Sequence, residues 1–190
     1  LDPYQYYSAG YACYLSDVNT MQDSWDIWDN HMSITNVKNG QIIGYKYFGF
    51  GGLKKAQKGL KPFEGTQKGN KTSFNLFLTP MTDASFKINI WLDGPWDNSV
   101  WKGKKIGEIT VPAGSIQEIT KYTIDVSEVV DKLDKKHAIF LVAESNSKEK
   151  LCVLQGLGFS KKGKSLEYPT VPTVEIMVDG KKVDLPTTPV

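Results

Sequence analysis

The residues of this 190-residue sequence that best suit contact with a ligand are its five tryptophans and the polar side chains beside them. Flat indole faces stack on the C–H faces of sugar rings, while neighbouring Asp and Asn side chains hydrogen-bond to hydroxyl groups. We therefore expect at least one tryptophan to face a ligand. The alternative for each tryptophan taken alone is that its side chain covers one end of the apolar core. The candidate contact residues are Trp25, Asp26, Trp28, Trp91, Trp96 and Trp101.

Trp91 is out of phase with the apolar side chains of its own segment. In residues 86–92, FKINIWL, every second side chain from Phe86 to Leu92 is apolar, which places these side chains on one face of a strand. Trp91 then projects from the opposite face, together with Lys87 and Asn89. A tryptophan in that position is either exposed or covered by another part of the chain.

The sequence does not predict an enzyme. Asp23, Asp26 and Asp29 crowd one segment, and paired carboxylates can hydrolyse a glycosidic bond. Closely spaced Asp residues in a Trp-rich loop more often supply turn hydrogen bonds or bind sugar hydroxyls. The only two histidines, His31 and His137, lack metal-ligand spacing. The sequence contains no GxSxG elbow and no Walker loop, so we expect neither catalysis nor a bound cofactor.

Composition argues against nucleic-acid and membrane partners. The formal net charge is +2, and all 23 basic residues are lysines, spread along the chain. Without arginine, the chain lacks the planar donor fork that pairs with phosphates and base edges. We interpret the lysines as a solvated surface. No apolar run approaches the roughly 20 residues of a membrane-spanning helix, so no membrane span is expected.

The elements that would position these residues are short β-strands. Apolar and polar residues alternate in segments bounded by Gly, Pro, Asn and Asp, which is typical of half-buried strands. Only residues 127–133 have helical spacing, with Ser127 as the expected N-cap and Glu128 in the first turn. This pattern predicts an all-β jelly-roll β-sandwich of two antiparallel sheets. The expected strands are residues 32–37, 41–50, 72–78, 85–92, 106–111, 117–126, 138–143 and 151–159.

The loops and the C-terminal region complete the predicted organisation. Residues 51–71 and 94–105 are rich in glycine and lysine and are expected to form long surface loops, where binding groups usually lie. The sandwich is expected to occupy residues 1–165. Residues 166–190 are expected to form a Pro-containing linker and a strand-like hairpin, which leads towards a following domain.

The order of these motifs resembles that of the family 6 carbohydrate-binding modules, particularly those attached to family 43 glycoside hydrolases that act on arabinoxylan. The resemblance implies a module that binds plant-type polysaccharide beside a tethered catalytic domain. It also implies a secreted or periplasmic protein, whose signal peptide would lie outside this sequence. The segments that carry it are LDPY, MSITNVKNGQIIGYKYFGF, KINIWLDGP, KKIGEITVPAG, HAIFLVAES and LCVLQGLGF.

The resemblance also shows where this sequence departs from the family. Members usually bind a structural calcium with two carboxylates, at positions that here correspond to Gly10 and Gln155. Loss of both carboxylates removes the charged oxygen ligands that Ca²⁺ prefers. The usual sugar pocket in the loops employs an Asn and an aromatic residue, which correspond here to Val153 and Ile116. Binding through that pocket is therefore not expected in its usual form.

Two features of the sequence offer a replacement for the usual pocket, at different places on the module. Trp25 and Trp28 lie in the loop that borders the usual pocket and would either rebuild or plug it. Trp91 matches a strand position on the sheet surface, where some family members carry a second site. The alternative is an eroded module that acts as a spacer or packs on the catalytic domain without binding sugar.

The two cysteines allow a further inference from the resemblance. If the first and last strands pair as in the family, with Gly10 opposite Gln155, then Cys13 lies opposite Cys152. A disulfide would then join the strands that calcium joins elsewhere in the family. The alternative is a pair of buried thiols, because a shift of one residue in register breaks the pairing.

Overall fold

The computed structural model describes residues 1–16, 32–170 and 176–183, and it contains all eight predicted strands. Two short strands that were not predicted, β1 (Tyr7–Ser8) and β2 (Tyr14–Leu15), precede them. Each predicted boundary agrees with the observed one to within a few residues. The eight strands are β3 (Ile34–Val37), β4 (Ile42–Gly49), β5 (Ser73–Pro80), β6 (Phe86–Leu92), β7 (Lys104–Val111), β8 (Thr120–Asp125), β9 (Lys136–Glu144) and β10 (Cys152–Ser160).

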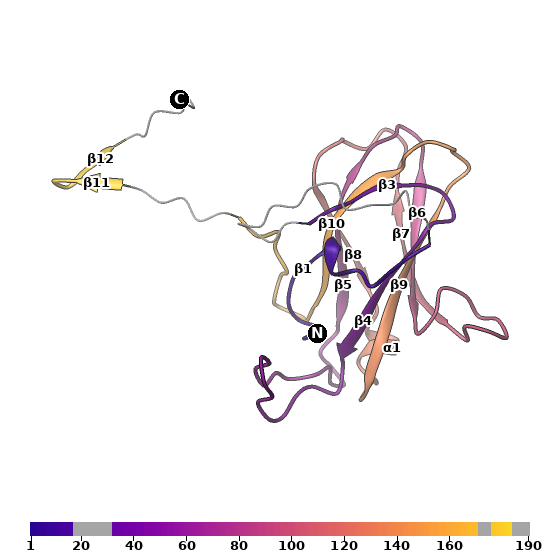
Figure 1. Cartoon of the computed structure of the whole chain (residues 1–190), viewed down its shortest axis with the longest axis horizontal. Coiled ribbons are helices and arrows are strands. Elements are labelled where there is room, and N and C mark those ends of the chain that lie inside the picture. The colour runs from indigo at the N-terminus through magenta and orange to yellow at the C-terminus, as the bar shows by residue number, and fades with distance from the viewer. Residues whose placement is uncertain (17–31, 171–175, 184–190) are drawn as a thin grey trace.

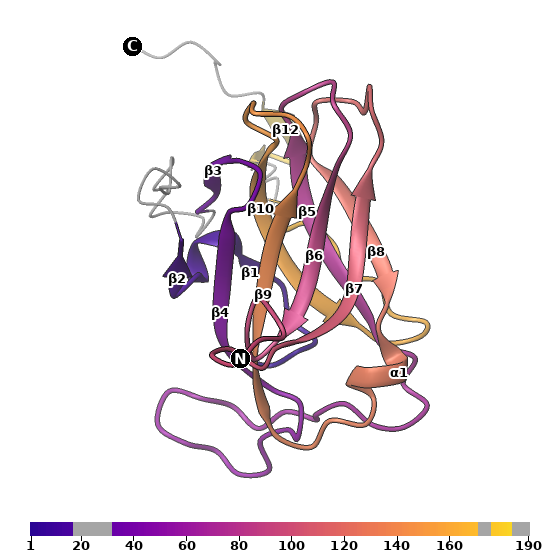
Figure 2. The same cartoon turned by 90° about the vertical axis from the view of Figure 1, so that its right-hand side faces the viewer.

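The strands form two antiparallel sheets, which confirms the predicted β-sandwich (Figure 1). The first sheet has the strand order β1-β10-β5-β8, and β3 also pairs with β10. The second sheet has the order β2-β4-β9-β6-β7. Figure 2 shows β4, β9, β6 and β7 side by side, with the first sheet behind them.

Apolar side chains from alternate strand positions fill the space between the sheets. On β6, Phe86, Ile88, Ile90 and Leu92 are all buried in this core, as the sequence predicts. At one end of the core, the Phe159 ring packs against the rings of Phe48, Phe50 and Phe74. The two sheets are therefore held together mainly by apolar burial.

The N-terminal strand crosses from one sheet to the other after two paired residues. Ser8 lies opposite Gly156 on β10, and the 3₁₀ turn η1 (Ala9–Tyr11) then redirects the chain. Cys13 follows this turn, and its backbone N–H donates to the carbonyl oxygen of Gly44 on β4, at 2.8 Å. Cys13 therefore belongs to the second sheet, whereas Cys152 lies on β10 in the first.

The inferred disulfide is consequently wrong. Both cysteines are free; Cys152 is fully buried, whereas Cys13 is exposed, so the alternative of two buried thiols holds only for Cys152. The inferred opposition of Gly10 and Gln155 assumed that pairing continues beyond Ser8. It does not, because η1 ends it.

We expect one reactive thiol in the folded protein and two in the unfolded protein. Cys13 is exposed, whereas burial raises the pKa of the Cys152 thiol and keeps reagents away from it. Titration with Ellman's reagent, before and after addition of guanidinium chloride, measures both values. A disulfide would give no reactive thiol in either condition.

The short α-helix and the C-terminal hairpin are close to their predicted positions. Helix α1 (Ser127–Val130) begins as predicted, but Ser127 is not its cap. The N-cap is Val126, and the Asp125 carboxylate accepts the Ser127 backbone N–H instead. Strand β11 (Ile176–Val178) pairs with β12 (Lys181–Val183) in the expected hairpin. In the described part of the chain, no helix has the length and apolar character needed to cross a membrane.

Candidate functional site

Four aromatic side chains meet on the outer face of the second sheet, and we call them the aromatic face. They are Tyr14, Trp91, Trp101 and Phe140. Trp91 on β6 lies directly opposite Phe140 on β9. The Trp101 ring lies 5.6 Å from that of Phe140 and 6.0 Å from that of Tyr14, both edge to face. Trp91 thus projects away from the core, as the sequence predicts, and is half-buried among these neighbours.

A glycine allows the Phe140 ring to lie close to the sheet. Gly44 on β4 is the cross-strand partner of both Phe140 and Tyr14. A Cβ atom at Gly44 would lie 2.8 Å from the Phe140 ring, so a larger residue would push the ring outward. Ile42, Ala138 and Val142 complete an apolar base beneath the four rings.

The loop between β6 and β7 carries Trp101 onto this face. The Asn98 side-chain oxygen accepts the backbone N–H groups of Val100 and Trp101, at 2.9 and 2.8 Å. The Gly103 backbone N–H donates to the Trp96 carbonyl at 2.7 Å and closes the loop. Trp101 is therefore positioned by hydrogen bonds within its own loop and by its contacts with Tyr14 and Phe140.

The base of the same loop is fixed by Asp93, which has a positive φ of 61°. Its carboxylate accepts the Ala138 backbone N–H at 3.0 Å and lies 2.7 Å from Nδ1 of His137. His137 thus has a structural partner at a strand end.

Charged and amide side chains border the aromatic face on β6, β7 and β9. Nδ2 of Asn89 donates to the Glu144 carboxylate at 2.8 Å, while the buried Asn89 Oδ1 has no partner in the described structure. Glu108 accepts from Lys105 and Lys87, each at 2.8 Å, and these hydrogen bonds lower its pKa to about 2. Glu108 is therefore ionised throughout the physiological range and offers hydrogen-bond acceptors beside the rings.

The outer face of the first sheet is covered by the chain itself. The Tyr6 ring lies 5.4 Å from Phe77 and 5.8 Å from Tyr168, so both terminal segments pack on this sheet. Lys121 fastens the C-terminal segment there by donating to Ser165 at 2.8 Å. The partly exposed rings on this face, Tyr6 and Tyr168, thus belong to terminal segments that pack over the sheet.

The other predicted contact residues are distributed unevenly. Trp96 is 43% exposed in the loop that carries Trp101, and it forms no aromatic ring pair with the residues that the structure describes. Trp25, Asp26 and Trp28 lie outside the described residues. Of the positions that match the usual loop pocket, Val153 is half-buried on β10 and Ile116 is 71% exposed between β7 and β8.

The two residues that correspond to the family's calcium ligands, Gly10 and Gln155, do not suit calcium. Gly10 offers only its backbone, and its N–H donates to the carbonyl of Met32. The Gln155 side chain donates to Oγ1 of Thr79 at 2.8 Å and leaves a single buried amide oxygen unpaired. Ca²⁺ prefers six to eight oxygen ligands that include carboxylates. Within the described ranges, no three His, Cys, Asp or Glu side chains group together for a metal ion.

Two members of the aromatic face, Tyr14 and Phe140, were not among the predicted contact residues. Phe140 lies in a strand that is apolar on both faces, which is typical of a strand buried on both sides. That two-sided pattern was the signal that something covers the outer face of β9. Tyr14 belongs to a two-residue strand, which is too short for alternation to be detected.

Comparison with known proteins finds similarity only at the level of structure. No protein-family model matches the chain, and no curated protein matches it. A family 43 arabinoxylan arabinofuranohydrolase from Bacillus subtilis, solved with cellotetraose, matches 85% of this chain at 20% identity, with a TM-score of 0.60. A family 6 carbohydrate-binding module from Clostridium cellulolyticum, solved with xylose, matches 85% of this chain and all of its own at 18% identity, with a TM-score of 0.54.

A β-1,3-glucan-binding family 6 module from Bacillus halodurans also matches, over 84% of this chain and 97% of its own, at 15% identity and a TM-score of 0.54. The match to the arabinofuranohydrolase covers only 28% of that longer enzyme. At these identities, the likeness establishes the fold. The resemblance to family 6 modules that the sequence predicts is therefore confirmed for the architecture.

Proposed function

We propose that this chain, which has the fold of the family 6 carbohydrate-binding modules, is a non-catalytic module that binds plant-type polysaccharide through its aromatic face. The observation that carries the proposal is the group of aromatic rings on the outer face of the second sheet, bordered by acids, amides and lysines. Residues from β6, β9, β2 and the β6–β7 loop build this group.

Each part of the face has a role in such binding. The Trp91 and Trp101 rings provide apolar planes for the C–H faces of sugar rings. Glu108 and Glu144 lie beside them and accept hydrogen bonds from hydroxyl groups, and the buried Asn89 holds Glu144 in place. Glu108 beside the rings has a lowered pKa, whereas a glycosidase acid requires a raised one, so this carboxylate suits hydrogen bonding to hydroxyl groups rather than proton donation.

We further propose that the chain is an accessory module of a secreted glycoside hydrolase. The likeness to one segment of a family 43 arabinoxylan arabinofuranohydrolase supports this context. A weak site gains value when it is tethered, because it raises the effective concentration of the catalytic domain at the polymer. The rival function is a spacer without sugar binding, which is favoured by Val153 and Ile116 at the positions of the usual loop pocket.

Affinity electrophoresis through gels that contain xylan, arabinoxylan, β-glucan or mannan tests the proposal. We expect at least one polymer to retard the chain, and we expect Trp91→Ala to weaken that binding by about tenfold, because it removes a stacking plane. Ile116→Ala is the control, because it removes an exposed apolar side chain at the position of the usual loop pocket. Unchanged mobility in all four gels would favour the spacer.

A further inference from the structure

A hollow lies between the N-terminal segment, the end of β4 and the loop of residues 51–71, away from the aromatic face, and we call it the tyrosine groove. Its volume is about 840 Å³, which is in the range of ligand-binding clefts. Tyr7, Tyr11, Tyr47 and Phe63 supply aromatic rings to its walls, and Leu60 closes one side. Tyr11 and Tyr47 are each about half exposed, so their rings are accessible to a ligand.

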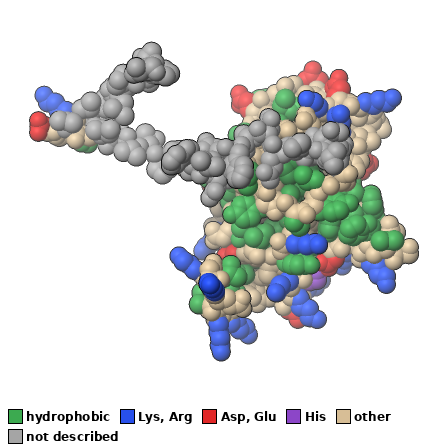
Figure 3. All heavy atoms as spheres, viewed as in Figure 1, with side chains coloured by type: hydrophobic (Ala, Val, Ile, Leu, Met, Phe, Trp, Pro, Cys, Tyr) green, Lys and Arg blue, Asp and Glu red, His purple; other side chains and the backbone are tan. Residues whose placement is uncertain are grey.

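The loop that forms one wall of the groove concentrates positive charge. Residues 51–71 contain six lysines and one acid, a net charge of +5, whereas the whole chain has a net charge of +2. The rest of the chain is therefore net negative, at −3. Figure 3 shows lysine side chains gathered at the end of the molecule where this loop lies.

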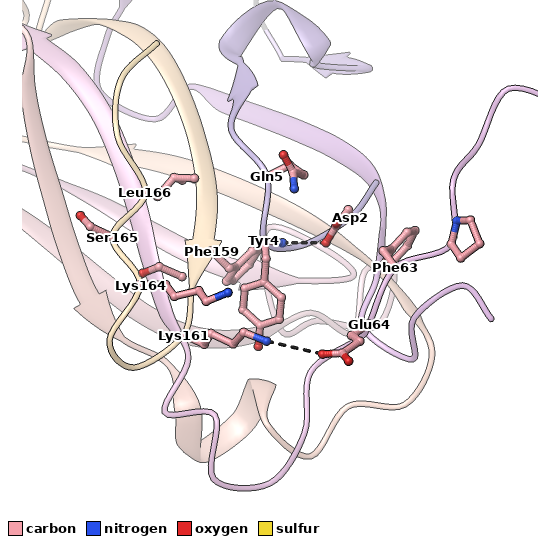
Figure 4. Close-up of a pocket in the computed structure, with 12 residues that line it drawn as sticks. Asp2, Tyr4, Gln5, Phe63, Glu64, Phe159, Lys161, Lys164, Ser165 and Leu166 are labelled. Carbon is pink, nitrogen blue, oxygen red and sulfur yellow. Dashed lines mark hydrogen bonds and ion pairs between the residues drawn. The ribbon is translucent and has the colours of Figure 1, made fainter. Parts of the chain in front are cut away.

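Two lysines line the groove itself, and two more line the hollow beside it. Lys61 and Lys136 belong to the groove. The adjoining hollow shares the Pro62–Phe63 wall and is lined by Lys161 and Lys164, whose side chains point towards the Tyr4 ring (Figure 4). The Nζ atom of Lys161 lies 5.3 Å from the centre of that ring.

The acids in these walls are already engaged, whereas most of the lysines are not. The Asp2 carboxylate accepts the Tyr4 backbone N–H at 3.0 Å, and Glu64 pairs with Lys161 at 3.5 Å. In the described ranges of the chain, Lys61, Lys136 and Lys164 form no ion pair. These ammonium groups are therefore available to an anionic ligand that enters the groove.

We propose that the tyrosine groove is a second polysaccharide contact, which selects chains that carry carboxylate groups, as uronic acid residues do. The inference rests on the proposed function, because it takes the ligand to be a polysaccharide. Tyrosine rings stack on the sugar rings, and the unpaired lysines attract the carboxylates. A neutral polymer gains nothing from the lysines, so the groove discriminates by charge. The absence of arginine disfavours phosphate-rich ligands.

Affinity electrophoresis with glucuronoxylan, and with the same polymer after chemical reduction of its carboxyl groups, tests the inference. We expect the double variant Lys61→Gln/Lys136→Gln to bind glucuronoxylan about fivefold more weakly, because two charge contacts are lost. Binding of the reduced polymer should not change. Raising the salt to about 0.5 M should remove most of the wild-type preference for the acidic polymer, because exposed charges are screened.

The matched control is Lys148→Gln/Lys150→Gln, which removes the same charge from the exposed loop between β9 and β10. That loop follows the far end of β9, about 30 Å of strand away from Lys136. Equal weakening by both pairs, or equal wild-type affinity for the two polymers, would overturn the inference. Failure of the proposed function has a different signature: Trp91→Ala would then bind the reduced polymer as well as the wild type does.

Discussion

Replacing Phe159 by alanine is expected to lower the free energy of unfolding by about 4 kcal/mol. The Phe159 side chain is fully buried between the sheets. Its ring centre lies 5.2 to 5.4 Å from those of Phe74, Phe50 and Phe48, all at steep angles. The variant would lose the apolar transfer energy of one ring and three edge-to-face contacts, and it would leave a cavity that rigid strands cannot close.

Urea denaturation followed by tryptophan fluorescence measures this loss. Phe159→Leu should cost less than half as much, because it keeps most of the apolar volume. Ile119→Ala is the control: Ile119 is 47% exposed in the loop before β8, and its truncation should change the unfolding free energy by less than about 0.5 kcal/mol. A loss below about 2 kcal/mol for Phe159→Ala would mean that the aromatic end of the core collapses around the gap.

The strands that could be predicted from sequence are those that are long enough for alternation to repeat. From Phe86 to Leu92, four apolar side chains alternate with Lys87, Asn89 and Trp91, and the structure places the two sets on opposite faces. In β9, which is apolar on both faces, a short apolar run bounded by polar residues marks the strand instead. The sheet to which each strand belongs was not predicted, because alternation states which face is buried but does not specify the partner strand.

The crossing of the N-terminal strand could not be predicted in this way. In strands of two residues the alternation has no repeat, so nothing in YYSAGYACYL marks the point where the chain changes sheets at η1. The inferred Cys13–Cys152 bridge depended on the pairing being continuous through that point. Ser8 has a partner on β10, yet Cys13, five residues later, is bonded to Gly44 on the other sheet.

The candidate site was predicted in part for a related reason. Trp91 could be identified because it breaks the pattern of its own strand. Trp101 was a candidate by composition, but its position on Phe140 depends on the closure of the loop between β6 and β7, which strand periodicity does not describe. The tyrosine groove could not be predicted, because its walls come from segments far apart in sequence.

The last prediction concerns the closure of the loop between β6 and β7. We expect Gly103→Ala to weaken polysaccharide binding by about tenfold or more while the sandwich stays folded. A Cβ atom at Gly103 would lie 2.1 Å from the carbonyl oxygen of Gly94 and 2.9 Å from that of Trp96. Both contacts are with backbone atoms, so the neck of the loop must open. Trp101 would then leave its place beside Phe140 and remove one plane from the aromatic face.

One spectroscopic measurement and two comparison variants separate loss of position from loss of stability. The tryptophan emission of Gly103→Ala should shift to longer wavelength, because Trp101 becomes more exposed to water. Gly114→Ala is the control, because Gly114 has a positive φ of 71° and open space around it, so this variant adds backbone strain without a steric clash. Asn98→Ala should weaken binding to a smaller extent, because it removes the two hydrogen bonds that orient Val100 and Trp101. If Gly103→Ala binds polysaccharide as tightly as the wild type, Trp101 is not a contact residue, and binding depends on Trp91 and its polar neighbours.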